Sequence, residues 1–297
     1  MVIAAVGLKL TRQPVFPYLD LTILGIGAFL TLGRIGCLLV GCCHGRPCRW
    51  GVRYGEEHAD AGFPSCLVGV RLFPIQAIES LWVLCTVAVG TYFVWTGSPA
   101  GTALAWYVVV YDVGRFCFEF ARGDADRPYW LGFSQPQWIS LVLTGAVAGA
   151  ELAGLLPLVA WHLATFILLA VAMVGVSLKR YFQSTPEFQL LHPKHIRQVA
   201  QAMKAICISR DHWNQRQSGD ATIIIACTSL GIRISGGAVH NETEDVCHYT
   251  LSADNFAMTK RIAKDLAALI QRLKGSDRPG KLVPGQAGVF HVLIWPA

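Results

Sequence analysis

The stretch GTALAWYVVVYDVGRFCFEFAR, residues 101–122, combines the length of a membrane-spanning helix with four charged side chains near its end. These are Asp112, Arg115, Glu119 and Arg122, at spacings of three, four and three. In an α-helix, at about 100° per residue, the four positions fall within an arc of about 80°. Ionisable groups at membrane depth are costly, so they pair with each other, face a bundle interior and mark a functional path. We therefore expect a functional face, and the alternative is a salt-bridge ladder that only docks helices.

The composition places the chain among membrane proteins. Of its 297 residues, 53% are hydrophobic and 15% are charged, and the mean hydropathy is +0.44. Average soluble domains carry about 25% charged residues. Long apolar runs continue to about Leu178, and a polar, mixed sequence follows. We expect a membrane domain over residues 1–180 and a soluble domain over residues 181–297.

Several apolar runs are long enough to span a bilayer. Crossing about 30 Å of hydrocarbon takes about 20 mostly apolar residues. Residues 21–40, 75–95 and 101–121 meet this length, and residues 138–178 hold two further runs separated near Pro157. The prediction is an α-helical polytopic membrane bundle of about five spans, followed by a small soluble α/β domain.

The C-terminal part has the pattern of a small α/β unit of about 110 residues, a plausible size for one domain. Apolar spacing predicts helices over 195–208 and 255–274, and strands over 221–226, 231–235 and 289–295. A turn is expected at Gly236-Gly237. This part carries no nucleotide-binding glycine pattern, zinc-finger spacing or nucleophile elbow, so we expect a regulatory or partner-binding role.

Basic residues flank the first two apolar runs. The net charge is +6, and the flanking residues are Arg34, Arg46, Arg49, Arg53 and Arg71. A basic surface close to lipid headgroups favours an anionic phospholipid as partner. Nucleic acid is excluded, because these arginines adjoin apolar spans and no recognised binding module accompanies them.

The stretch GRIGCLLVGCCHG, residues 33–45, places Arg34 in the C-terminal part of the first apolar run. We expect Gly33, Gly36 and Gly41 to allow close backbone approach around it. A guanidinium in this position suits a phosphate, because its planar fork makes paired hydrogen bonds with phosphate oxygens.

The stretch FPIQAIE, residues 73–79, lies at the start of the second run. Pro74 is expected to open a helix, and Gln76 and Glu79 lie three positions apart on one face of it. An amide and a carboxylate are therefore predicted near one end of the second span.

In this order, the three stretches resemble the prolipoprotein diacylglyceryl transferase family. That family carries a GRxGNFxNxExxG signature, then HPxQLYE, then a GxxRFxxEFxRxPD block followed by a span led by GQ. The matching positions, over about residues 8 to 155, are Gly33, Arg34, Ile35, Gly36, Gly41 and Gly45, then Pro74, Gln76 and Glu79, then Gly114, Arg115, Phe116, Glu119, Phe120, Arg122 and Asp124, and then Gln137.

The resemblance implies a multi-pass enzyme of the bacterial cytoplasmic (inner) membrane that uses no cofactor. Its reaction moves a diacylglyceryl group from phosphatidylglycerol to the lipobox cysteine thiol that follows a prolipoprotein signal peptide, and releases glycerol phosphate. A base forms the thiolate nucleophile, and Arg34 and Arg115 are expected to neutralise the departing phosphate. The residues expected to bind or orient the substrate are Gln76, Glu79, Asp112, Glu119, Arg122, Gly36 and Gly45.

The chain departs from the family pattern at several positions. Cys37 stands at the signature asparagine, Cys42 at the later acidic position, and Phe73 at the histidine of HPxQ. The family's upstream half, with a His-Gly-Gly segment, has no counterpart here, and we expect a further segment upstream. His44 is the expected substitute base, beside Arg46, whose charge opposes its protonation. The alternative function is a catalytically reduced lipid-binding or scaffold membrane protein.

Cysteines crowd the region after the first span, at Cys37, Cys42, Cys43, Cys48 and Cys66, close to His44. Their spacing matches no standard CxxC pair, so no metal site is predicted, and a soft-metal site is the less favoured alternative. Disulfides are expected if this loop is extracytoplasmic. Otherwise we expect the thiols to pack as small apolar residues.

The orientation of the bundle stays open. The positive-inside count places the arginine-rich loop after the first span in the cytoplasm. The family resemblance places the same loop on the outer side, where arginines bind lipid phosphate and are a poor marker of topology.

Overall fold

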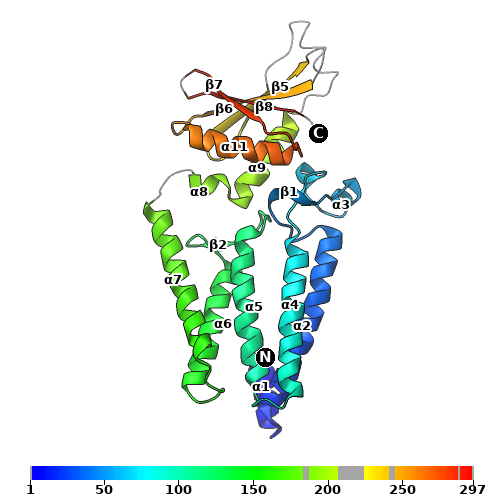
Figure 1. The fold of residues 1–297 in the computed structure, drawn as a ribbon, viewed down its shortest axis with the longest axis vertical. Helices are drawn as coiled ribbons and strands as arrows, with labels where there is room; N and C mark the ends of the chain where they lie inside the picture. Colours follow the sequence, from blue (N-terminus) through cyan, green and yellow to red (C-terminus); the bar gives the residue numbers. More distant parts are fainter. Residues whose placement is uncertain (1, 183–186, 207–223, 241–244, 287, 296–297) are drawn as a thin grey trace. The chain divides into compact units, whose positions relative to one another are not determined.

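The computed structural model describes residues 2–182, 187–206, 224–240, 245–286 and 288–295 (Figure 1). The chain forms two compact units. Unit 1 comprises Met1–His44, Pro74–Arg122 and Arg127–Phe182, and unit 2 comprises Gly45–Phe73, Gly123–Asp126 and Gln183–Ala297. The expected boundary at residues 180–181 lies close to the point where the chain finally leaves unit 1, and two earlier loops also belong to unit 2.

Unit 1 is a helical bundle (Figure 1). Helix α4 packs against α2 and α5, α5 packs against α6, and α6 packs against α7. The long helices are α2 (Val15–Val40), α4 (Ile75–Trp95), α5 (Thr102–Phe118), α6 (Gln135–Leu152) and α7 (Ala160–Phe182). The short elements are α1 (Val2–Leu10), the 3-10 helix η2 (Glu119–Ala121), and the hairpin strands β2 (Tyr129–Trp130) and β3 (Phe133–Ser134).

Three helices of the described chain, α2, α4 and α7, are long and apolar enough to cross a membrane. Large apolar side chains such as Phe29 and Leu32 are exposed along α2. Inside the bundle, Ser80 Oγ donates a hydrogen bond to the backbone oxygen of Thr31 at 2.9 Å. An apolar exterior around a hydrogen-bonded interior is typical of a membrane bundle. Five spans were predicted, and three helices of the described chain meet this criterion. Helix α5, with 17 residues, and helix α6 do not meet it, so the count of five is not confirmed.

The charged stripe is not one continuous helical face. Asp112 and Arg115 lie on α5, but α5 ends at Phe118 and Glu119 opens the 3-10 helix. Arg122 is extended, with φ −72° and ψ 147°. The prediction of an α-helix through residue 121 is therefore wrong at its end. Tertiary ion pairing explains the difference, because the buried Arg122 side chain bonds a carboxylate on another helix.

Asp20 joins α2 to the start of α5. Its Oδ2 accepts a hydrogen bond from the Gly101 backbone N–H at 2.7 Å, and its Oδ1 accepts one from the Leu104 N–H at 2.7 Å. The first N–H groups of a helix lack intrahelical acceptors, and a carboxylate there also opposes the positive end of the helix dipole. Asp20 is buried, so one side chain caps α5 inside the bundle.

Unit 2 is built on an antiparallel sheet of order β4-β5-β6-β8-β7. The strands are β4 (Ile225–Cys227), β5 (Ile232–His240), β6 (Asp245–Ala253), β7 (Lys281–Pro284) and β8 (Phe290–Ile294). Helices α9 (Pro193–Ala205) and α11 (Lys260–Leu273) share its core with alternate strand residues, among them Ile232, Ile234, Leu251 and Val292. The remaining elements are β1 (Pro47–Val52), α3 (Glu56–Asp60), η1 (Ser65–Leu67) and α8 (Glu187–Leu190).

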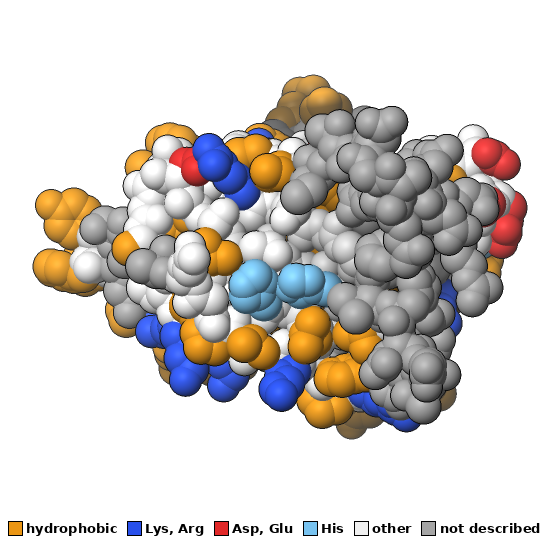
Figure 2. Space-filling view, turned by 90° about the horizontal axis from the view of Figure 1, so that it is seen from above, with side chains coloured by type: hydrophobic (Ala, Val, Ile, Leu, Met, Phe, Trp, Pro, Cys, Tyr) orange, Lys and Arg blue, Asp and Glu red, His pale blue; other side chains and the backbone are white. Residues whose placement is uncertain are grey.

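Residues that alternate with this core belong to the other face of the sheet. His248 Nε2 lies 3.0 Å from His291 Nδ1, and these residues are on the neighbouring strands β6 and β8. Figure 2 shows histidine side chains, in pale blue, on the surface seen there. Partial burial, and then the charge of His291, lower the pKa of His248. His248 therefore stays neutral to a lower pH than a free imidazole.

The expected turn at Gly236-Gly237 is wrong. Both glycines lie inside β5, where Gly236 pairs with Tyr249 and Gly237 pairs with His248. A Cβ atom at Gly236 would come within 3.2 Å of the Tyr249 ring, so the aromatic side chain covers the glycine. Cross-strand packing thus extends β5 beyond the end that the sequence predicts.

The other helices and strands predicted for unit 2 are present as helices and strands, and their first and last residues differ from the prediction. The predicted strand over 289–295 is β8, and the one over 221–226 matches β4 only in part, with residues 221–223 outside the described residues. The helix expected from residue 255 begins at Lys260, because Thr259 Oγ1 accepts a hydrogen bond from the Ile262 N–H at 3.3 Å. The helix expected over 195–208 is α9, and residues 207–208 lie outside the described residues. Strands β6 and β7 were not predicted.

His195 is a buried hydrogen-bonding centre of unit 2. Its Nδ1 donates to the Leu190 backbone oxygen at 2.7 Å, and its Nε2 lies 3.1 Å from Thr228 Oγ1. Burial lowers the pKa of His195, while the bond to Leu190 acts in the opposite direction. A neutral imidazole satisfies both contacts, because it has one donor and one acceptor nitrogen.

Replacing Asp20 by Ala is expected to lower the free energy of unfolding by about 1–2 kcal/mol, because two N–H groups at the start of α5 lose their acceptor. Chemical unfolding in detergent micelles, followed by tryptophan fluorescence, measures the change. Asp20→Asn keeps one acceptor oxygen and should lose less. Equal stability of Asp20→Ala and wild type would contradict the capping role.

Acidification is expected to destabilise unit 2 through His195. The pKa of His195 is lowered in the folded state. Below the unfolded value of about 6.5 the unfolded state therefore binds more protons, and the stability decreases as the pH decreases. Between pH 6.5 and pH 5 the loss is at most about 2 kcal/mol. Hydrogen exchange of α9, corrected for intrinsic rates, measures it in the full chain. The His195→Gln variant should lose this pH dependence, and an unchanged dependence in that variant would assign it to another group.

Candidate functional site

Glu79 is the centre of a buried charged cluster in unit 1. It lies near the start of α4, and its side chain is 3% exposed. Its Oε2 is 2.8 Å from Arg34 Nε on α2. Its Oε1 is 3.0 Å from Arg115 Nη1 on α5 and 3.0 Å from Arg122 Nη1, which follows η2. One carboxylate therefore joins arginines from three separate segments of the chain.

Glu119 is the second carboxylate of the cluster. Its Oε1 is 3.0 Å from Arg115 Nη2 and also forms an ion pair with Arg127 Nη1. Arg115 thus binds a different carboxylate with each terminal nitrogen, which fixes the plane of its guanidinium. Arg127 was not predicted from the sequence. The only available signal was a basic residue five positions after Arg122, and many arginines of this chain lie as close to a span.

In these ion pairs four arginines meet two glutamates, so the six side chains together carry a net charge of +2. Arg122 is buried, whereas the side chains of Arg34 and Arg127 are each 16% exposed. Among the described residues, the terminal nitrogens of Arg34 donate no hydrogen bond. A partly exposed guanidinium beside excess positive charge favours an anion with several acceptor oxygens, such as a phosphate.

Gln76 connects this cluster to the loop after α2. Its Nε2 donates a hydrogen bond to the Cys42 backbone oxygen at 2.9 Å. Its Oε1 is buried and has no hydrogen-bond partner among the described residues. Gln76 lies one helical turn before Glu79, so the same end of α4 holds both the loop and the arginines.

Three of the predicted site residues take no part in these ion pairs. Asp112 is buried, forms no ion pair in the described part of the chain, and has an Oδ2 atom without a partner there. Gly36 is exposed, and a Cβ atom at Gly36 or Gly33 would meet no atom within 4 Å, so the expected close backbone approach is absent there. Gly45 belongs to unit 2, where its N–H bonds the Phe73 oxygen at 3.2 Å. A Cβ atom at Gly45 would lie 2.4 Å from that oxygen, so close packing of the backbone leaves room only for glycine at this position.

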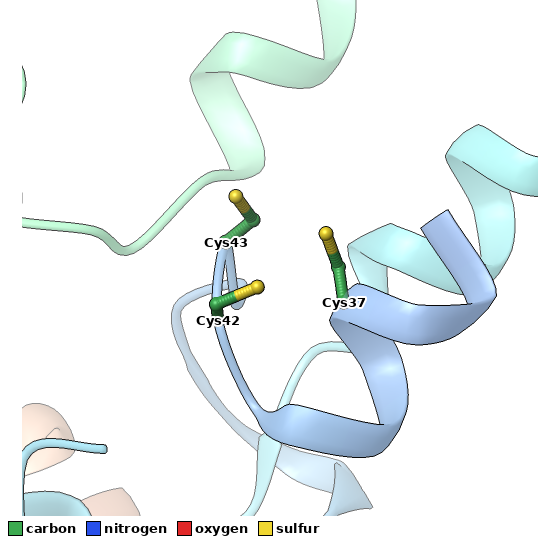
Figure 3. Close-up of side chains that lie close together, drawn as sticks. All are labelled: Cys37, Cys42 and Cys43. Atoms are coloured by element: carbon green, nitrogen blue, oxygen red, sulfur yellow. The ribbon is translucent and has the colours of Figure 1, made fainter. Parts of the chain in front are cut away.

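Three thiols lie close together at the end of α2 and in the loop that follows it (Figure 3). The Sγ atoms of Cys37, Cys42 and Cys43 all lie within 4.8 Å of one another. The desolvation of its thiol, and then the neighbouring Cys37 and Cys43 thiols, raise the pKa of Cys42 to about 12, although the residue as a whole is exposed. Cys42 is therefore a neutral thiol in the chain without bound ligands. His44, the predicted base, follows directly and is buried.

The chain matches a known family over its N-terminal half. The family model described as prolipoprotein diacylglyceryl transferase matches residues 1–152. These residues contain the whole charged cluster and the three thiols of the loop. No solved structure gives a significant match.

Curated relatives match the same part. The phosphatidylglycerol–prolipoprotein diacylglyceryl transferase 2 of Clostridium perfringens is 33% identical over 154 residues, which are 49% of this chain and 55% of that protein. The transferase of Clostridium tetani is 32% identical over 134 residues, 45% of this chain and 51% of that protein. The transferase 2 of Streptomyces coelicolor is 32% identical over 152 residues, 49% of this chain and 46% of that protein. The chain thus spans about half the length of these relatives.

Replacing Glu79 by Gln is expected to lower the free energy of unfolding of unit 1 by about 3–5 kcal/mol, because three arginines lose a shared buried counter-charge. Thermal and chemical unfolding in detergent measure this change. The control Glu57→Gln removes an exposed carboxylate and should change stability by less than about 0.5 kcal/mol. Similar small effects of both variants would show that Glu79 is not the structural centre of the cluster.

Proposed function

The chain belongs to the prolipoprotein diacylglyceryl transferase family, and on this premise we propose that unit 1 transfers a diacylglyceryl group from phosphatidylglycerol to a cysteine thiol of a prolipoprotein. The observation that carries the proposal is the arginine cluster around Glu79. Its positive excess is complementary to a phosphodiester and to the phosphate that leaves. The family match covers residues 1–152, which include every member of that cluster.

In the proposed reaction, Arg34 and Arg115 bind the phosphate group. The thiolate sulfur attacks the glyceryl carbon, the carbon–oxygen bond to phosphate breaks, and glycerol phosphate leaves with one more negative charge than the diester carried. Cations that are fixed before the reaction stabilise this added charge more than they stabilise the substrate, which accelerates the step. Glu79 and Glu119 act as positioning residues, since they orient the guanidinium groups.

The lipid substrate implies a place in the bacterial cytoplasmic (inner) membrane, and we propose that α5 and α6 also span it. At 1.5 Å per residue, helices of this length reach about 26 Å, close to the hydrocarbon thickness. Packing of α5 between α4 and α6 supports this arrangement. The other proposed substrate is a prolipoprotein whose signal peptide lies in the same membrane. For residues 181–297 we propose a soluble domain that regulates unit 1 or binds a partner.

Complementation of a transferase-depleted bacterium tests the function. The unmutated chain should restore diacylglyceryl modification of a reporter lipoprotein, measured by its mass. Arg34→Ala and Arg115→Ala should each reduce modification by a factor of about 100 or more, because each removes a cation that stabilises the leaving phosphate.

Two controls make the result decisive. Arg12→Ala removes an exposed arginine outside the cluster and should leave modification unchanged. Membrane insertion of every variant is checked by fractionation, and detergent-extracted variants by their melting temperature. A well-inserted unmutated chain that modifies no reporter would contradict the proposed transfer and favour a lipid-binding or scaffold role.

A further inference from the structure

The thiols of Cys37, Cys42 and Cys43 come together from the end of α2 and from the loop after it. Figure 3 shows Cys37 on the end of α2 and Cys42 with Cys43 on the loop that follows, with the three side chains around a common space. Their Sγ atoms lie within 4.8 Å of one another, and none of the three is in a disulfide. Cys42 is exposed and the other two are half-buried, so a small ion can reach them.

The backbone of the loop holds this arrangement in place. Gly41, at φ 84°, ends α2 in the left-handed region, and its N–H bonds the Cys37 oxygen. Cys43 is also left-handed, at φ 56°, a conformation that non-glycine residues rarely adopt. Two such residues within three positions reverse the chain, so Cys43 returns toward Cys37. The bond from Gln76 to the Cys42 oxygen fixes the middle of the turn.

We propose that Cys37, Cys42 and Cys43 bind a soft d10 metal ion, Zn²⁺, and leave its fourth position open for the substrate thiol. This inference rests on the proposed function, and the metal would activate the substrate thiol by lowering its pKa. Zinc–sulfur bonds of about 2.3 Å place the sulfurs of a tetrahedral site about 3.8 Å apart. The Sγ atoms need to approach by no more than about 1 Å, which side-chain rotation provides. Three protein ligands with one open position are the pattern of catalytic zinc.

The charge of the four arginines and two glutamates around Glu79 favours such a site. Three thiolates and one Zn²⁺ carry a net charge of −1, and the neighbouring cluster carries an excess of two positive charges. Arg34 lies one helical turn before Cys37 on α2, and Gln76, which holds the Cys42 oxygen, lies one turn before Glu79 on α4. The metal would therefore lie next to the arginines that bind phosphate.

Two of the three ligands differ from the family signature. Cys37 and Cys42 replace an asparagine and an acidic residue, which are oxygen ligands, by sulfur ligands. Sulfur ligands select Zn²⁺ and Cu⁺ over the ions that prefer oxygen. The thiol cluster is therefore a property of this chain rather than of the family signature.

The chemical step balances without a side-chain base. When the substrate thiol coordinates Zn²⁺, its proton passes to water, because a coordinated thiol is deprotonated. The sulfur then attacks the glyceryl carbon, a carbon–sulfur bond forms, and the carbon–oxygen bond to phosphate breaks. Glycerol phosphate leaves beside Arg34, and the thioether product, a weaker ligand than a thiolate, dissociates from the metal.

The first test is metal binding by the full chain in detergent, reduced and stripped with a chelator. It should bind one equivalent of Zn²⁺, and Co²⁺ in its place should give the thiolate charge-transfer bands of a tetrahedral site. Cys37→Ser and Cys43→Ser should each weaken Zn²⁺ binding at least about 100-fold. Cys85→Ser and Cys117→Ser, which remove exposed thiols on α4 and α5, are the matched controls and should bind as wild type.

The second test examines the open position. Adding N-acetylcysteine methyl ester to the Co²⁺-loaded chain should increase the thiolate bands, because a fourth sulfur enters the coordination sphere. No spectral change would exclude an open position and overturn the inference. Tight binding of Cu⁺ without Zn²⁺ binding would overturn the proposed zinc site. Formation of a disulfide within the cluster with no metal uptake after reduction would overturn it as well.

Transferase assays then separate this inference from the function on which it rests. Loss of activity on chelation, recovered with Zn²⁺, supports both. Full activity of the metal-free chain overturns the metal's role and leaves the transferase intact. Binding of Zn²⁺ and of the added thiol by a chain that transfers nothing overturns the proposed function, while the metal site stands.

Discussion

Glu79 is a single carboxylate on which three arginines depend. Arg34, Arg115 and Arg122 come from α2, α5 and the segment after η2, and each places a nitrogen within 3.0 Å of it. A buried guanidinium without a counter-charge is costly, so the positions of these segments are coupled through one side chain. The early end of α5 follows from this constraint, because Arg122 reaches Glu79 from extended backbone.

The same end of α4 also organises the loop after α2. Gln76 bonds the Cys42 oxygen, one turn before the arginines meet. The charged cluster around Glu79 and the group of three thiols are therefore held by one helix start. With the proposed metal site, this proximity would hold a substrate thiol beside the phosphodiester, and aligned reactants react as parts of one complex. The bundle thus has a charged cluster near the start of α4 and an apolar exterior along α2 suited to lipid.

Unit 2 is stabilised by different interactions. Its core lies between an antiparallel sheet and two amphipathic helices, and its strands are joined by backbone ladders rather than by buried ion pairs. Local sequence predicted β8 and both helices, because apolar spacing of 2 and 3.6 residues is a local property. It ended β5 too early, because the Tyr249 ring that covers Gly236 comes from another strand.

The sequence by itself determined the membrane character and the family, and it predicted residues of the candidate site. Arg34, Gln76, Glu79, Arg115 and Glu119 were predicted from local motifs, because helical spacing and adjacency to apolar runs are read along the chain. Tertiary structure alone decided which charges pair: it joined Arg122 to Glu79, added Arg127, and left Asp112 and Gly36 outside the cluster. It alone also brought Cys37 to Cys42 and Cys43, through two left-handed residues. The physical reason is that ion pairs and metal sites depend on distances between segments, which sequence spacing does not fix.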